Sequence, residues 1–326
     1  MKKNSANETE YLYSCARIRA MERRLPDKAL LERIILADGR ETASLLKDRG
    51  IDLSLGIEGA IAKLMDTTHR ELLSELPDAA PARIFLYQYD CNNLKLAIKA
   101  AIMGQSAEKM LFSCGTLAPS VALDAVRSGD FSPFPENMAK EAGEAARAAA
   151  ATGNPQTVDL LLDRACFLDM LEAARPYPRA LSWVKLKIDA LNALFCIRII
   201  RLGGDSALLE ELLLPGGDID RSIFLDARVG GESALFEHLG RTRLSALSRV
   251  SGKGGRASLS ELERAADDLF IEAVREARFI PFGAEIITAY TVALEYALKN
   301  VRIILAGKEA GLDANAIRGR IRTLYV

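Results

Sequence analysis

The sequence predicts an all-helical protein built from three related units, and three observations support this prediction. Good helix formers (Ala, Leu, Glu, Lys and Arg) dominate the 326 residues. No run alternates β-branched and polar residues in the way that strands do. A sequence segment around Asp90 also returns around Asp189, and more loosely around Asn300.

Short breaks containing proline or glycine separate the expected helices. Asp27 stands directly before an apolar run and is expected to cap a helix there. Residues 154–155 (Asn-Pro) are typical of an N-cap followed by proline in the first turn. Residues 258–261 (Ser-Leu-Ser-Glu) form a capping-box pattern, which predicts a long helix that reaches about Phe279. The alanine-rich segment 138–151 predicts a further helix with one exposed face.

Composition excludes several classes of protein. Hydrophobic residues make up 49% of the chain, which is enough for a sizeable core. The 43 Lys and Arg residues balance the 44 Asp and Glu residues, so we expect no nucleic-acid partner. No stretch approaches the ~18 uncharged apolar residues that cross a membrane. The first ten residues lack the apolar core of a secretory signal.

The five cysteines favour a reduced, cytosolic chain. They are odd in number, widely spaced and never form a Cys-x-x-Cys pair, so we interpret them as small hydrophobic residues. They are Cys15, Cys91, Cys114, Cys166 and Cys196.

The internal repeat is the most informative feature. Residues 89–104 and 188–203 each contain an Asp, an Asn three residues later, a basic residue, and a Gly at the same distance from the Asp. These residues are Asp90, Asn93, Lys99 and Gly104 in the first copy, and Asp189, Asn192, Arg198 and Gly203 in the second. A third copy, 293–307, keeps Asn300, Arg302 and Gly307. Three copies predict three helical domains, residues 1–117, 118–220 and 221–326.

The repeated polar residues are predicted to be structural clamps rather than catalytic residues. The i, i+3 spacing puts Asp90 and Asn93 on one face of a helix. Their neighbours are almost all apolar, so this face should be buried, and buried polar groups must be hydrogen-bonded. We expect the pair to tie the following glycine-containing turn, or a neighbouring helix end, to the core helix. The glycine that ends each copy is expected to cap its helix.

We find no pattern of residues that predicts chemistry. Asp66 and His69 have one acid-x-x-His spacing, whereas a carboxylate di-metal site needs two such motifs and further Glu residues. We therefore interpret His69 and His238 as polar residues on helix surfaces. Residues 251–255 lack the spacing of a phosphate-binding loop and are interpreted as a flexible basic loop. The cysteines lack a nearby His to activate them. We expect no catalytic residue, cofactor, metal or small-molecule substrate.

Five segments, in this order, also carry a resemblance to a known family over roughly residues 10–320. With them the chain resembles the C component of bacterial and archaeal V/A-type ATP synthases, the counterpart of the d component of the eukaryotic V-ATPase. The segments are 11–20 (YLYSCARIRA), 30–37 (LLERIILA), 89–104 with 115–117, 187–204 with 214–217, and 281–307.

The resemblance implies three similar helical domains arranged with approximate threefold symmetry to form a funnel. In that family the protein is a non-catalytic part of the rotor in the central stalk. It lies on the cytoplasmic face of the plasma membrane, peripheral to it, on the proteolipid ring. Its cavity receives the end of the central shaft formed by the D and F subunits, so that torque passes between head and ring.

Two further interpretations remain open at this point. The chain could be a free helical-repeat adaptor unrelated to an ATPase, or a helical metalloenzyme that uses Asp66 and His69. A basic N-terminal run could meet acidic groups on a partner, or could simply be the exposed face of an amphipathic helix. It consists of Arg17, Arg19, Arg23 and Arg24.

Overall fold

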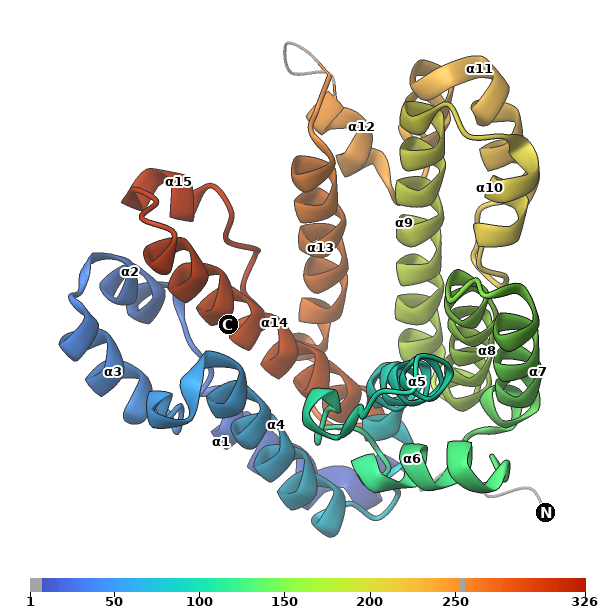
Figure 1. The fold of residues 1–326 in the computed structure, drawn as a ribbon. Coiled ribbons are helices and arrows are strands. Elements are labelled where there is room, and N and C mark those ends of the chain that lie inside the picture. The colour runs from blue at the N-terminus through green and yellow to red at the C-terminus, as the bar shows by residue number, and fades with distance from the viewer. Residues whose placement is uncertain (1–7, 252–255) are drawn as a thin grey trace. The chain divides into compact units, whose positions relative to one another are not determined.

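The computed structural model describes residues 8–251 and 256–326 (Figure 1). Within these residues every regular element is a helix and none is a strand, which confirms the predicted all-α class. The first seven residues and residues 252–255 of the predicted basic loop lie outside the described part, so the predictions made for them stay predictions.

The helices are mostly long and are joined by short connections. α11 bends at Gly231, whose φ of 83° is not helical. The α-helices are α1 (Leu12–Glu22), α2 (Lys28–Leu36), α3 (Gly39–Lys47), α4 (Gly56–Glu75), α5 (Ala80–Ile102), α6 (Pro119–Ser128), α7 (Glu136–Thr152), α8 (Gln156–Ala174), α9 (Pro178–Leu202), α10 (Ser206–Leu212), α11 (Arg221–Leu239), α12 (Ser245–Ser251), α13 (Leu259–Arg275), α14 (Ala284–Glu309) and α15 (Ala314–Arg318). Short 3₁₀ turns are η1 (Glu8–Tyr11), η2 (Leu53–Leu55), η3 (Glu108–Met110) and η4 (Glu276–Phe279).

The chain forms two compact units. Unit 1 combines Met1–Phe85 with Phe270–Val326, and unit 2 is the continuous segment Leu86–Leu269. The chain passes from unit 1 to unit 2 inside α5 and returns inside α13. The finer division into domains 1–117, 118–220 and 221–326 stays a prediction.

Helix α14 is the core of unit 1. Of its 26 residues 18 are buried, and they lie on all sides of the helix. A helix that is apolar all round must be covered on every face, and α1, α2 and α4 pack against it (Figure 1). The buried hydroxyl of Thr288 finds a hydrogen-bond partner within this core, since it donates to the carbonyl of Pro81 at 2.8 Å.

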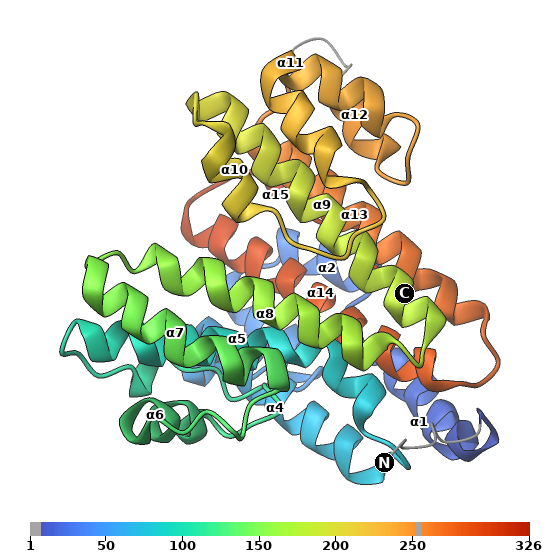
Figure 2. The same ribbon diagram turned by 90° about the vertical axis from the view of Figure 1, so that its right-hand side faces the viewer.

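Unit 2 is built around α9 and the hairpin of α7 and α8. Helices α7 and α8 lie side by side, and α9 packs against both α8 and α11 (Figure 2). The unit 2 part of α5 is joined to α8 by an ion pair between Lys95 and Asp163, whose charged atoms lie 2.7 Å apart. The three copies of the sequence repeat thus fall on α5, α9 and α14, the longest helices of the described residues at 23, 25 and 26 residues.

Local capping signals set several helix starts. The Asp27 carboxylate accepts from the backbone N–H of Leu30 at 2.8 Å, as expected of an N-cap. In the predicted capping box, the N–H of Glu261 donates to the Ser258 hydroxyl at 3.2 Å. The Glu261 carboxylate in turn accepts from the Ser258 N–H at 2.8 Å. The helix that follows ends at Arg275 and continues as the 3₁₀ turn η4.

Two of the three repeat glycines end their helices as predicted. Gly104 and Gly203 have φ of 64° and 67°, the left-handed conformation that glycine adopts without a Cβ clash. The N–H of the next residue then bonds back across the turn, from Gln105 to Ala100 at 2.8 Å and from Gly204 to Ile199 at 3.0 Å. This is the Schellman arrangement, which satisfies carbonyls that the helix end leaves open.

The prediction that Gly307 ends the third helix is wrong. Gly307 lies inside α14, and Gly311, with φ of 68°, takes the capping role instead. The N–H of Leu312 bonds back to the carbonyl of Gly307 at 2.9 Å. Gly307 has a different role: a Cβ there would lie 2.9 Å from Cγ1 of Ile317, so the Ile317 side chain or α15 would have to shift to make room for it.

We therefore expect Gly307→Val to lower the free energy of unfolding by about 2 kcal/mol, because it overpacks the contact with Ile317. Gly39→Val is the matched control, since a Cβ at Gly39 meets nothing within 4 Å. Urea unfolding followed by circular dichroism measures both variants. Equal unfolding midpoints for the two would contradict this account of Gly307.

Candidate functional site

The first repeat helix is tied to the turn that follows it by an amide clamp. The N–H of Phe112 donates to Oδ1 of Asn93 at 2.7 Å, and Nδ2 of Asn93 donates to the carbonyl of Phe112 at 2.8 Å. One side chain therefore satisfies both backbone groups of one turn residue. The Phe112 ring also lies against the ring of Tyr89, with centroids 5.9 Å apart.

The carboxylate of Asp90 holds the next part of the same turn. It accepts from the backbone N–H of Thr116 at 2.9 Å and of Leu117 at 3.1 Å. The Thr116 hydroxyl adds a bond of 2.5 Å. Asp90 and Asn93 are buried, as the apolar surroundings in the sequence indicated, so these bonds replace water that the side chains lose.

The second repeat helix repeats this geometry. The N–H of Leu214 donates to Oδ1 of Asn192 at 2.8 Å, and Nδ2 of Asn192 donates back to the Leu214 carbonyl at 2.9 Å. Asp189 accepts from the N–H groups of Asp218 and Ile219, each at 3.1 Å. Both side chains are buried.

The third repeat keeps only the amide half of the clamp. Asn300 is fully buried. The backbone N–H of Arg322 donates to Oδ1 of Asn300 at 2.8 Å, and Nδ2 of Asn300 donates to the Arg322 carbonyl at 3.0 Å. The position three residues earlier holds Ala297, a buried apolar residue. Here the clamp fixes the non-helical segment after α15 rather than a glycine turn.

Each complete clamp requires a glycine opposite its carboxylate. A Cβ at Gly115 would overlap Oδ1 of Asp90, and a Cβ at Gly217 would overlap Oδ1 of Asp189. The acid and the glycine are therefore coupled, because the backbone must approach the carboxylate closely enough to donate two N–H bonds. This coupling explains why both turns contain glycine at this point.

Burial dominates the electrostatics of the second clamp. Loss of water raises the pKa of Asp189 to about 6, and the N–H groups of Ile219 and Asp218 offset this only in part. The carboxyl of Asp169, also buried, has a pKa raised for the same reason. Such shifts bring the protonation of these two carboxyl groups to a higher pH than that of exposed Asp side chains.

The basic residues of the repeats form ion pairs with neighbouring helices of their own unit. Ion pairs that remain at least partly open to solvent contribute little stability, typically up to about 1 kcal/mol, and mainly set how the helices align. The pairs are Lys99 with Asp159, Arg198 with Glu263, and Arg302 with Glu58.

Two of the N-terminal arginines bind groups of unit 1. Arg17 pairs with Glu71 and Glu75 of α4. Arg19 pairs with Glu22 at 2.7 Å and donates to the carbonyls of residues 277, 278 and 280. These contacts join α1 to η4 and α4.

The other two arginines lie at the end of α1 and are exposed. The guanidinium groups of Arg23 and Arg24 form no ion pair within the described residues. The four arginines thus divide into an inner and an outer pair, and contact of any of them with a partner protein stays a prediction.

The structure corrects the interpretation of His69. It is 2% exposed and lies in the interior, not on a helix surface as predicted, whereas His238 is exposed as predicted. Asp66 forms an ion pair with Arg70. Across residues 8–251 and 256–326, no group of three or more His, Cys, Asp or Glu side chains could hold a metal ion. All five cysteines are buried, and none of them forms a disulfide.

Asp169 is a structural residue that the sequence analysis missed. It lies on α8 and accepts from the backbone N–H groups of Asn137 and Met138, each at 2.9 Å. It therefore caps the start of α7, whose own N-cap residue is Pro135 and has no capping side chain. Local sequence carries no signal of this bond, because donor and acceptor are about thirty positions apart and meet only when α7 and α8 pack.

Comparisons with known proteins agree over nearly the whole chain. The sequence model of the ATP synthase (C/AC39) subunit family matches residues 14–320. The C component of the V-type sodium ATPase of Enterococcus hirae is 25% identical over 78% of this chain and 78% of its own length. The C component of the A-type ATP synthase of Thermococcus kodakarensis is 23% identical over 95% and 90%, and that of Haloferax volcanii is 24% identical over 95% and 96%.

The clamps generate a first prediction for this site. Asn93→Leu, Asn192→Leu and Asn300→Leu should each lower the free energy of unfolding by about 1–3 kcal/mol, because each leaves a backbone N–H and carbonyl unpaired. Gln105→Leu, at an exposed position, is the control and should change little. Chemical unfolding of each full-length variant is the measurement. Wild-type stability in all three clamp variants would refute the clamp role.

A second prediction concerns pH. The pKa of Asp189 is about 6 in the folded protein against an ordinary value of 3.8, so the folded state retains a proton that the unfolded chain has released. As pH rises from about 4 to about 6, wild type should therefore lose stability relative to Asp189→Asn. Denaturant unfolding across this range measures the difference.

The exposed carboxyl of Asp130 supplies a control of opposite sign. Hydrogen bonds from Ser132 lower its pKa, so wild type should gain stability relative to Asp130→Asn as pH rises through the acid range. If the Asp189 difference is flat, or rises with pH as the Asp130 difference does, the assigned role of burial is wrong.

Proposed function

The chain belongs to the ATP synthase (C/AC39) subunit family, and from this premise we propose that it couples the rotating shaft to the membrane ring of a V/A-type ATP synthase. As a member of the family it is one part of a larger complex. In the proposed role it is a non-catalytic part of the central stalk. It receives the D and F subunits on one side and the proteolipid ring on the other, on the cytoplasmic face of the plasma membrane.

The match over residues 14–320 is the observation that carries this proposal. It includes all three repeat helices and parts of both units, so nearly the whole chain, and not one segment, matches the family. The named relatives are the C components of a V-type sodium ATPase and of A-type ATP synthases. Among the helices of the described residues, none is long and apolar enough to cross a membrane.

The clamps support the mechanical part of the proposal. A part that transmits torque must resist local deformation, and turns are the places where a helical protein yields most easily. In this chain Asn93, Asn192 and Asn300 each fix a non-helical segment to a long buried helix. Densely packed helices are themselves poorly compressible. The same device therefore stiffens both units, at the points where their loops leave the core.

The buried acids support a non-catalytic role. Asp90, Asp169 and Asp189 all direct their oxygens at backbone N–H groups. A general acid or base must instead present its carboxyl to a substrate. These residues already have a structural use, and we propose that catalysis resides in other parts of the complex.

Purification of the assembled complex tests the proposal. Tagged full-length chain isolated from gently solubilised native membranes should bring down the shaft proteins and the proteolipid ring. Removal of the chain should leave ATP hydrolysis by the head intact but uncouple it from ion transport. Tagged chain with the exposed substitution Gln105→Leu is the folded control and should bring down the same partners as the wild type. Recovery of the chain with partners that include no ATP synthase component would overturn the proposal in favour of a free helical adaptor.

A further inference from the structure

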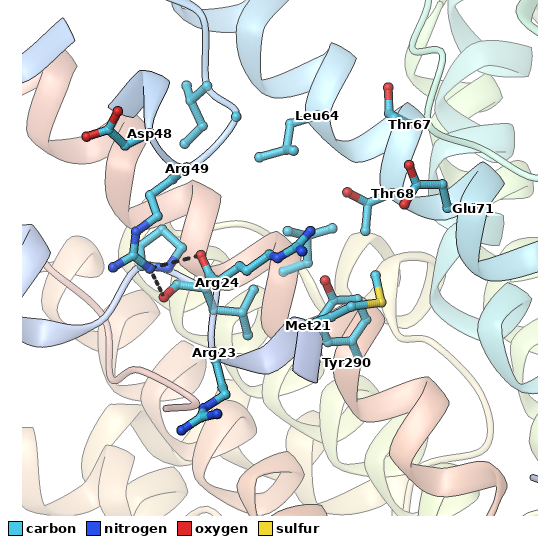
Figure 3. A pocket seen from close by; sticks show the side chains of 15 residues that line it. Met21, Arg23, Arg24, Asp48, Arg49, Leu64, Thr67, Thr68, Glu71 and Tyr290 are labelled. Atoms are coloured by element: carbon cyan, nitrogen blue, oxygen red, sulfur yellow. Dashed lines mark hydrogen bonds between the residues drawn. The ribbon is translucent and has the colours of Figure 1, made fainter. Parts of the chain in front are cut away.

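A cavity of about 430 Å³ lies within unit 1, next to the end of α1 (Figure 3). The segment that follows α3, and helices α4 and α14, form the rest of its wall. Its apolar surface comes from Leu25, Ile51, Leu64 and Leu294, and its polar surface is formed mainly by arginine, threonine and tyrosine side chains. The clamps and ion pairs described above leave this cavity unexplained.

Arg24 supplies the positive charge of the cavity. Its side chain extends toward Thr68 and Tyr290, whereas Arg23 points away (Figure 3). The guanidinium of Arg24 forms no hydrogen bond or ion pair within the described residues. Arg49 lies on the opposite side and donates to the carbonyls of Arg24 and Leu25, at 3.2 and 3.3 Å. Arg49 thus holds the backbone that carries Arg24 and is itself already bonded.

Tyr290 adds a polar group that has no partner in the described part of the protein. Its side chain is only 3% exposed, yet its hydroxyl forms no hydrogen bond with any described residue. The hydroxyl points into the cavity, toward Arg24 (Figure 3). Burial raises the pKa of Tyr290, so it remains a neutral O–H donor. Because the hydroxyl faces the cavity, water there can accept its bond, and a bound molecule can take the place of that water.

The acids on the wall do not cancel this charge. Arg17 lies 3.7 Å from Glu71 and also pairs with Glu75, so it offsets the charge of Glu71 only in part. The side chain of Glu71 is 55% exposed, so water screens the rest of its charge. Asp48 is exposed and turned away from the centre of the cavity (Figure 3). The cavity therefore offers the exposed guanidinium of Arg24, which is unpaired among the described residues, and the Tyr290 hydroxyl, next to apolar side chains.

We propose that this cavity is a binding site for a carboxylate that is attached to an apolar body. The Arg24 guanidinium binds the carboxylate through two parallel N–H bonds, and the Tyr290 hydroxyl donates a third bond. The aliphatic walls cover the body. A free organic acid and the C-terminal residue of a peptide share this chemistry. The inference does not depend on the proposed function, because it concerns the isolated full-length chain.

Titration calorimetry with small probes tests the site. N-acetylleucine presents a carboxylate and an apolar side chain as a peptide end does, and N-acetylleucine amide is the matched uncharged probe. Hexanoate represents a free organic acid, and acetate lacks the apolar body. We expect N-acetylleucine or hexanoate to bind, and the amide and acetate to bind at least about tenfold more weakly. Which of the two binds more tightly tells the peptide end from the free acid.

Three variants locate the binding. Arg24→Gln should weaken it about tenfold or more, and Tyr290→Phe by a smaller factor. Arg23→Gln is the matched control, because Arg23 points away from the cavity, and it should leave the binding unchanged. Thermal unfolding of each variant reports whether the substitution alters stability. Because Arg24 is exposed, Arg24→Gln tests the site even if Tyr290→Phe is destabilised. Absence of binding by both acids, equal binding of the amide, or equal effects of the Arg23 and Arg24 variants would overturn the proposal.

Discussion

The fold depends on a buried amide that satisfies both backbone groups of a distant loop residue. An asparagine side chain has one acceptor and donors on a planar group, which matches the carbonyl and N–H of a single residue. Asn93, Asn192 and Asn300 all use this match on their long helices. The bond replaces water on both partners at once, so neither can leave the core without exposing unpaired groups. The asparagine on the helix thereby fixes the position of the loop.

The carboxylates extend the same principle and explain its variation. Asp90 and Asp189 can hold two N–H groups only where the backbone comes unusually close, and Gly115 and Gly217 permit that approach. Where the acid is replaced by Ala297, no glycine turn is held. A buried carboxylate needs compensation for lost hydration, as the raised pKa of Asp189 indicates. Acid and glycine therefore belong together, and the amide is the part that all three copies keep.

Sequence reasoning predicts well where the cause is local or repeated. The all-α class follows from helix-forming residues, and the cap at Asp27 follows from its place before an apolar run. Sequence reasoning fails where the role of a residue depends on contacts with segments that are distant in the sequence. Gly307 has the spacing of a helix end, but its neighbour Ile317 decides its role. His69 has a polar side chain on a helix that packing places inside. The lining of the Arg24 cavity comes from four separate segments, which no local pattern brings together.

The order of segments in unit 1 has a consequence for synthesis of the protein. Unit 2 is one continuous stretch, so all its parts are available once residue 269 has left the ribosome. The core helix of unit 1, α14, is made only afterwards, although the helices that cover it were made first. While unit 2 is being translated, the apolar faces of helices α1, α2 and α4 therefore remain without the α14 surface that covers them in the finished fold. A nascent chain that stops before α14 leaves these faces open to chaperones and proteases, so only a finished chain offers a closed unit 1 for assembly.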